Sequence, residues 1–210
     1  MYKKNKKYSV ILNGNFPKES SLLKMINDSE FIIAVDGAAN KLIDLEIIPD
    51  VIIGDFDSFQ ATRIKRIKLV ETSDQNKTDF RKTLDWCIEK NILNISIFGI
   101  SGESEDHFLG NYYTLNDFSN KIEWIAFTDF SIIKPCIRKK EFESYKGQKV
   151  SLFSMKGDTL VSSKNLEYPL DSYLLTPSDN AVRNISISNK FIIESSNNIL
   201  VFQSRKQIIG

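Results

Sequence analysis

Short apolar runs separated by segments of mixed polarity organise the first half of the chain. Each run is followed within two residues by a glycine or an acidic residue. The runs are Ser9–Leu12, Phe31–Val35, Val51–Ile53, Ile67–Val70 and Ile95–Phe98. Continuous apolar runs of this length are typical of strands that are buried on both faces of a parallel sheet.

Helical spacing is clearest after the fourth run. There, apolar side chains recur about one helical turn apart at Phe80, Leu84, Cys87 and Ile88. Strands that alternate with helices predict an α/β fold built on an open, Rossmann-like parallel sheet. Such sheets bind ligands just beyond the carboxyl ends of their strands.

The second half has a different pattern, because from about Phe130 onward short segments alternate between apolar and polar positions and helical periodicity is weak. We expect strands at Lys149–Phe153, Ser172–Leu175, Ile185–Ser188, Phe191–Glu194 and Ile199–Phe202. Glycine, proline and asparagine separate these segments, which predicts a small antiparallel β-sandwich. The sequence therefore predicts two domains, residues 1–128 and residues 129–210.

Composition excludes several classes of protein. The 210 residues contain 28 Lys+Arg and 27 Asp+Glu, so no strong basic field favours nucleic acid as a partner. No run approaches the roughly 18 apolar residues that a membrane helix needs. The apolar run behind the N-terminal lysines stops at Leu12, too early for a secretory signal. Cys87 and Cys136 lack metal-ligand spacing, so we expect free thiols in a reducing cytoplasm.

Carboxylates follow two neighbouring predicted strands. Asp55 and Asp57 come after Val51–Ile53, and alternate side chains of an extended segment share one face, so both carboxylates could bind one Mg²⁺. Asp36 ends the preceding strand and should lie at the same edge of the sheet. An acidic turn or a helix cap would explain either motif taken alone.

Further polar groups are expected at that edge. Asp79 and Lys82 are three residues apart at the start of the predicted helix, so an acid and a cation lie beside free backbone N–H groups. An exposed first turn with a solvated lysine is the alternative. The segment from Gly99 to Gly102 suits close approach to a nucleotide, and His107 could carry a proton or make a structural hydrogen bond. Together these groups predict metal-assisted phosphoryl transfer.

The motifs that carry this chemistry resemble those of thiamine pyrophosphokinases. They are Asp36–Asn40, Pro49–Ser58, Asp74–Lys82 and Gly99–Asn111, and the resemblance covers about residues 10–115. It implies an α/β ATP-binding domain, a β-sandwich domain, and a homodimer with thiamine bound near the subunit interface. It also implies transfer of a diphosphate group from ATP to thiamine, with AMP as the second product.

The same resemblance implies a role for each site residue. Mg²⁺ would be held by Asp36, Asp55, Asp57 and Asp79, and the catalytic residues would be Asp57, Asp79, Lys82 and Asp106. ATP would be bound by Asn13, Gly14, Gly99, Ser101, Gly102 and His107, and thiamine by Gln75, Thr78, Ser178 and Asn180.

Two departures from the family pattern leave alternatives open. Ser104 stands where the family usually has an arginine, and Asp179 separates Ser178 from Asn180. Loss of the arginine would fit a nucleotide- or thiamine-binding module without catalysis, unless Lys77, Arg81, Lys82 or a partner subunit replaces it. A haloacid-dehalogenase-like phosphohydrolase, with Asp55 as nucleophile and Asp57 as acid/base, is a second alternative. It would leave the Asp74–Lys82 segment unexplained.

Overall fold

The computed structural model describes residues 6–55, 67–72, 74, 76–102, 104–179 and 181–206. These residues divide into two compact units that separate after Asp129. Three residues that the sequence places in the site, Asp57, Gln75 and Asn180, lie outside the described residues.

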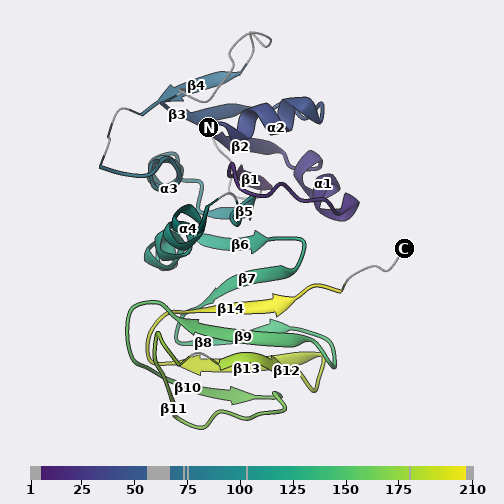
Figure 1. Ribbon diagram of the computed structural model, residues 1–210, viewed down its shortest axis with the longest axis vertical. Coiled ribbons are helices and arrows are strands. Elements are labelled where there is room, and N and C mark those ends of the chain that lie inside the picture. The colour runs from purple at the N-terminus through teal and green to yellow at the C-terminus, as the bar shows by residue number, and fades with distance from the viewer. Residues whose placement is uncertain are drawn as a thin grey trace. The chain divides into compact units, whose positions relative to one another are not determined.

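The first unit is built on a parallel sheet (Figure 1). Its strands are β1 (Tyr8–Ile11), β2 (Phe31–Val35), β3 (Val51–Gly54), β4 (Lys68–Glu71), β5 (Asn94–Phe98) and β6 (Glu123–Phe127). They lie in the order β4-β3-β2-β1-β5-β6, and every neighbouring pair is parallel. The chain leaves β1 first toward β2 and later returns to its other side as β5, so the topological switch point lies between β1 and β5. In open α/β sheets the ligand binds at that point.

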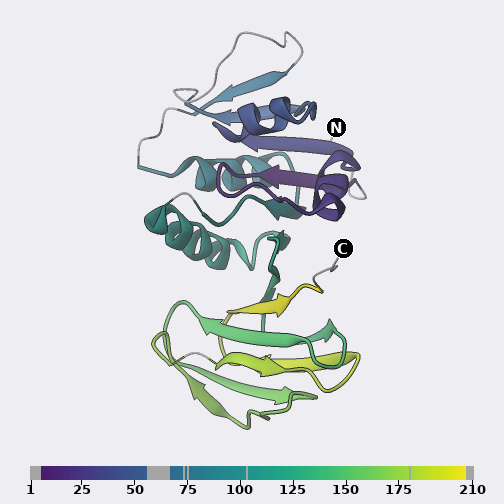
Figure 2. The same cartoon turned by 45° about the vertical axis from the view of Figure 1, so that its right-hand side comes forward.

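Helices cover both faces of this sheet. They are α1 (Ser20–Asn27), α2 (Ala38–Asp44), α3 (Asp79–Glu89) and α4 (Glu105–Phe118). Figures 1 and 2 show α1 and α2 on one face and α3 and α4 on the other. Leu22 and Leu42 pack into a core with Ile11, while Phe80 and Leu84 are buried from α3. The predicted helix is therefore confirmed, with Phe80, Leu84 and Cys87 buried and Ile88 partly buried.

The second unit contains only strands among its described elements. They are β7 (Ser131–Cys136), β8 (Lys139–Glu143), β9 (Lys149–Ser154), β10 (Thr159–Lys164), β11 (Tyr173–Leu175), β12 (Ala181–Ile185), β13 (Lys190–Ser195) and β14 (Ile199–Ser204). Four pair in the order β12-β9-β14-β7 and four in the order β11-β10-β13-β8, all antiparallel. Both groups contribute to one core, in which the rings of Phe142 and Phe191 stack 5.0 Å apart. The predicted mixture of a parallel α/β sheet with separate antiparallel strands is confirmed.

One predicted strand of this unit is wrong in position. The expected strand Ile185–Ser188 begins where β12 ends, and Ser186 makes only an isolated bridge to Leu166. The register of β12 against β9 is irregular before Asn184, and Arg183 has a φ of +60°. The Asn184 side chain also hydrogen-bonds the backbone of Tyr168. The paired strand, β12, therefore lies closer to the N-terminus than the apolar pattern predicted, and it contains a local bulge.

Both cysteines are free and buried, as predicted. Burial raises the pKa of the Cys87 thiol to about 12 and that of Cys136 to about 11. The thiols are therefore neutral at physiological pH and fill apolar space. None of the helices in the described part of the chain is long and apolar enough to cross a membrane.

Candidate active site at the carboxyl edge of the parallel sheet

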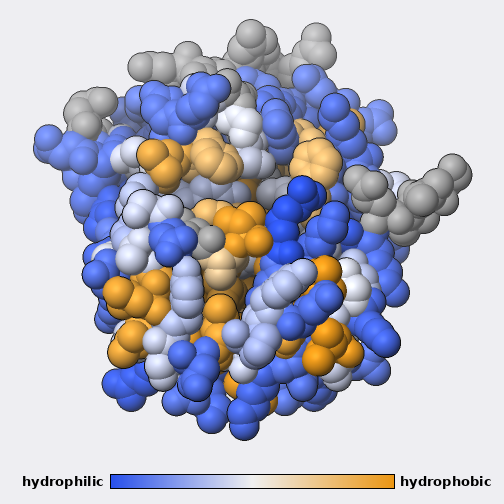
Figure 3. Space-filling model, turned by 60° about the horizontal axis from the view of Figure 1, so that its bottom comes forward, coloured by the Kyte–Doolittle hydropathy of each residue, from blue (hydrophilic) through white to orange (hydrophobic). Residues whose placement is uncertain are grey.

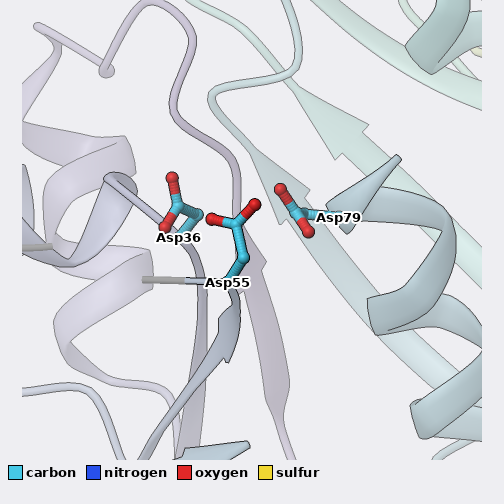
Figure 4. Close-up of side chains that lie close together, drawn as sticks. All are labelled: Asp36, Asp55 and Asp79. Carbon is cyan, nitrogen blue, oxygen red and sulfur yellow. The ribbon is translucent and has the colours of Figure 1, made fainter. Parts of the chain in front are cut away.

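Three carboxylates converge at the ends of neighbouring elements. Asp36 follows β2, Asp55 follows β3 and Asp79 is the first residue of α3. One oxygen of each carboxylate lies within 4.8 Å of one oxygen of the other two, and all three residues are partly buried. Figure 4 shows the side chains pointing toward one another. Closely spaced carboxylate oxygens are the ligands that a hard divalent cation prefers.

Asp36 is held in an uncommon backbone conformation. Its φ is +41°, a left-handed region that aspartate adopts more readily than most residues, and its N–H donates to Ile53 O at 2.9 Å. A Cβ added to Gly54 would lie 2.9 Å from the Cβ of Asp36 and 3.2 Å from its Oδ1. Gly54 is therefore needed because the Asp36 side chain occupies the space that a larger residue would fill.

Lys82 is buried beside Asp79. Its ammonium donates to Asp79 Oδ1 at 3.0 Å and to the carbonyl of Thr72 at 3.2 Å. The Lys82 side chain is only 7% exposed, so the alternative of a solvated lysine in an open helical turn is wrong. Since a buried ammonium needs partners, the lysine fixes the orientation of Asp79 and joins α3 to the end of β4. Thr78 caps the same helix, because its hydroxyl accepts the N–H of Arg81 at 3.3 Å.

The other cations near the start of α3 also have acidic partners. Lys77 pairs with Asp85 at 2.8 Å, and the hydrogen bond that Lys77 donates to Asp85 is the main cause that raises the pKa of Lys77. Arg81 pairs with Asp117 of α4 at 3.2 Å. Both side chains are thus engaged away from the three carboxylates, which makes them weak replacements for the missing arginine.

Two loops meet at the topological switch point. The loop after β1 donates from Gly14 N–H to Gly99 O at 3.0 Å and from Asn15 N–H to Ser101 O at 2.6 Å. The loops thereby continue the pairing of β1 and β5 beyond the ends of the strands. Most of the residues predicted to bind ATP lie here, namely Asn13, Gly14, Gly99, Ser101 and Gly102.

Glycine is required in these loops by the neighbouring backbone. A Cβ on Gly14 would lie 2.4 Å from Gly99 O and 2.5 Å from Ser101 O. Gly99 has a φ of +69°, and its Cβ would lie 2.2 Å from Leu12 O. The side chain of Asn15 similarly occupies the space beside Gly102. The glycines therefore allow the two loops to approach each other closely, and close approach to a nucleotide stays a prediction.

Two side chains that support these loops were missed as site residues. The Lys41 ammonium, on α2, donates to the carbonyls of Asn13 and Gly14. The Asn111 amide, on α4, donates to Ile100 O at 3.0 Å. Asn111 belongs to a family motif, but nothing in the pattern around Lys41 distinguishes it from a surface lysine.

Asp106 and His107 lie in the exposed first turn of α4. The hydroxyl of Ser104 is the main cause that lowers the pKa of Asp106, and the His107 N–H, at 2.8 Å, lowers it further. Ser104, at the position of the family arginine, thus stabilises the charged form of Asp106. The carboxylate cluster in the described part of the chain does not include Asp106.

Ser178 lies in the second unit, in the turn between β11 and β12. Its hydroxyl is 3.1 Å from that of Thr176, which also accepts the N–H of Asp179. The Asp179 carboxylate accepts the hydroxyl of Tyr173 at 2.9 Å. Asp179, the residue that interrupts the family's Ser-Asn pair, therefore has a local structural role in this turn.

Two family models match the chain. The model of the thiamin pyrophosphokinase catalytic domain matches residues 22–126, half of the chain, and the model of the substrate-binding domain matches residues 132–202. The chain belongs to the thiamin pyrophosphokinase family. The resemblance inferred from the sequence motifs is therefore confirmed.

Individual relatives agree with this assignment. The chain is 40% identical over 89 residues to thiamine pyrophosphokinase of Bacillus subtilis and 31% identical over 99 residues to thiamin pyrophosphokinase 1 of Caenorhabditis elegans. These matches span 40% and 42% of this chain, and only 42% and 41% of the two relatives.

Solved structures of family members share the fold. A crystal structure of thiamine pyrophosphokinase from Bacillus subtilis superposes with a TM-score of 0.78 at 23% identity, covering 97% of this chain and 100% of that one. Thiamin pyrophosphokinase from Candida albicans gives 0.80 at 19% identity, covering 94% and 89%.

Proposed function

We propose that this protein is a Mg²⁺-dependent thiamine pyrophosphokinase that transfers diphosphate from ATP to the hydroxyl of thiamine and releases AMP. The observation that carries the proposal is the convergence of Asp36, Asp55 and Asp79 at one edge of the parallel sheet. Family membership of both halves of the chain supports it.

The two units would have different roles. Residues 1–128, the Rossmann-like domain, would bind ATP and Mg²⁺ and hold the catalytic groups. Residues 129–210, a β-sandwich, would contribute to thiamine binding and dimerisation. Asp57, Gln75 and Asn180 remain part of this proposal on the strength of their motifs.

The residues present fit a magnesium ion. Asp36, Asp55 and Asp79 offer closely spaced carboxylate oxygens, and we assign Asp57 to the same site from its motif. Mg²⁺ usually takes a small number of carboxylates and completes its coordination with water and substrate phosphates. When bound, the ion would supply positive charge that polarises the phosphoryl oxygens.

The chain's own groups would orient the reactants. Lys82 would keep Asp79 in place, and the paired loops after β1 and β5 would position the nucleotide. A carboxylate would accept the proton of the attacking thiamine hydroxyl. The candidates are Asp79, which belongs to the carboxylate cluster, and Asp106, which lies outside it in the first turn of α4. Placement of the reactants would contribute more than base strength, since the transition state of phosphoryl transfer is loose.

The reaction products distinguish this function from its alternatives. We expect purified protein, incubated with thiamine, ATP and Mg²⁺, to form AMP and thiamine diphosphate in equal amounts, and to form neither without the metal ion. ADP with inorganic phosphate, or a covalent aspartyl phosphate on Asp55, would instead identify a phosphohydrolase. Binding of ATP and thiamine without either product would identify a module that has lost catalysis.

We also propose that the protein is a homodimer and, because both cysteines are free, that it is cytoplasmic. Figure 3 shows apolar patches on one face of the molecule. In the second unit Leu160 and Leu174 are paired in register and each is 50% exposed, which offers an apolar surface to a second copy.

Light scattering tests the dimer. We expect twice the mass of one chain, and a shift toward one chain in a variant carrying both Leu160→Glu and Leu174→Glu. Lys164→Glu, at an exposed position of β10, is the control and should leave the mass unchanged. A wild-type protein with the mass of a single chain would contradict the proposal.

A further inference from the structure

Lys41 links α2 to the loop that follows β1. Its ammonium donates to the carbonyl oxygen of Asn13 and, at 3.0 Å, to that of Gly14. The lysine is partly buried and directly follows the Asp36–Asn40 motif. Two hydrogen bonds from one charged group to successive carbonyls fix both the position of that loop and the direction of its peptide groups.

The loop that Lys41 holds is the one at the topological switch point. Gly14 N–H bonds to Gly99 O, and Asn15 N–H bonds to Ser101 O. Gly14 has no room for a side chain, because an added Cβ would collide with the carbonyl oxygens of Gly99 and Ser101. Carbonyl oxygens carry partial negative charge and would repel a phosphate group, and an ammonium bound to them offsets that charge.

We propose that Lys41 is a positioning residue for the phosphate groups of the nucleotide, acting through the carbonyls of Asn13 and Gly14. This inference rests on the proposed ATP-dependent function. The inference depends only on the two hydrogen bonds that the Lys41 ammonium donates to the loop, and other contacts of the ammonium do not affect it.

Two other cations in the described part of the first unit are engaged elsewhere. Lys82 holds Asp79 on the metal side of the site. Arg81 is paired with Asp117, and Ser104 supplies no charge where the family has an arginine. Lys41, by contrast, brings positive charge to the loop predicted to contact ATP.

The test compares ligands that differ in phosphate content. Dissociation constants for ATP, AMP and adenosine are measured by calorimetry with Mg²⁺ present, for the wild type and for Lys41→Met. We expect ATP binding to weaken about 10- to 100-fold, because a charged donor of two hydrogen bonds is lost, and adenosine binding to change less than about twofold. Lys41→Arg should restore most of the ATP affinity, since it keeps the charge and the donors.

Steady-state kinetics provides the second measurement. In Lys41→Met the KM for ATP should rise by a similar factor while the KM for thiamine stays near the wild-type value. Lys24→Met, which removes an exposed lysine of α1, is the matched control and should change neither constant. Thermal unfolding of each variant identifies any general loss of folding, and Lys41→Gln replaces Lys41→Met if the latter does not fold.

The outcomes separate this inference from the proposed function. Unchanged ATP affinity in Lys41→Met, or an equal loss for adenosine and ATP, would overturn the role of Lys41 alone while the wild type still forms AMP and thiamine diphosphate. A wild-type protein that binds no ATP would overturn the proposed function itself.

Discussion

Replacing Asp55 with asparagine is expected to lower the rate of AMP formation by at least about a thousand-fold. The substitution keeps the size of the side chain but removes one negative charge from the group formed with Asp36 and Asp79. Binding of a divalent cation would weaken accordingly, because Mg²⁺ binds charged carboxylate oxygens far better than amides. The measurement is the initial rate of AMP formation as a function of Mg²⁺ concentration.

Asp44→Asn is the matched control for this prediction. It makes the same chemical change at an exposed position of α2 and should leave the rate within about twofold of the wild type. Circular dichroism should show that both variants fold. Near-normal turnover in Asp55→Asn, at any magnesium concentration, would contradict the assignment of the carboxylates to a metal site. The same loss of turnover is expected for Asp57→Asn.

Much of the first unit is predictable because its signals are local. The apolar runs correspond to β1, β2, β3, β4 and β5 within one residue at every boundary. β1, β2 and β3 are largely buried, which leaves little choice of residue. The expectation of burial on both faces is wrong for β4, which ends the strand order and is mostly exposed. The α3 helix follows from apolar spacing and begins at Asp79 with a threonine cap. Once parallel strands are assumed, the carboxyl edge of the sheet follows as the place where Asp36 and Asp55 meet.

Other features depend on contacts between residues that are distant in sequence. The need for glycine at position 54 arises from the register of β2 against β3, which places Asp36 beside it. The burial of Lys82 depends on the carbonyl of Thr72 at the end of β4. Similarly, Asp129 accepts the N–H groups of Lys18 and Glu19, which directly precede α1. No local sequence pattern predicts these contacts, because their partners are distant in sequence.

The second unit was harder to predict because half-buried antiparallel strands tolerate many residue types. The strands β7, β8 and β10 gave no signal strong enough to be singled out, and β12 is displaced by its bulge. A strand's alternation gives the face that is buried but not the residue at which pairing begins. Lys41 was missed for a related reason, since its partners are backbone carbonyls and any sequence supplies those.

A methyl group at position 14 tests the paired loops most directly. In Gly14→Ala the new Cβ would lie 2.4 Å from Gly99 O and 2.5 Å from Ser101 O, and both are backbone atoms that cannot rotate away. The loops must separate, which breaks the hydrogen bond from Gly14 N–H to Gly99 O and the one from Asn15 N–H to Ser101 O. We expect the KM for ATP to rise at least about a hundred-fold, as misplacement of a substrate-positioning loop by about 1 Å can cause.

Stability should change in the same variant, and a second glycine supplies the control. Overpacking of this kind costs about 1–3 kcal/mol, so thermal unfolding of Gly14→Ala should occur at a lower temperature. Gly110 lies within α4, where an added Cβ meets nothing within 4 Å, so Gly110→Ala should stabilise the helix slightly and leave the KM for ATP unchanged. If Gly14→Ala bound ATP as well as the wild type does, the loops at the switch point would not form the nucleotide site. The phosphates would then have to be bound elsewhere along the carboxyl edge, and the role inferred for Lys41 would fail with them.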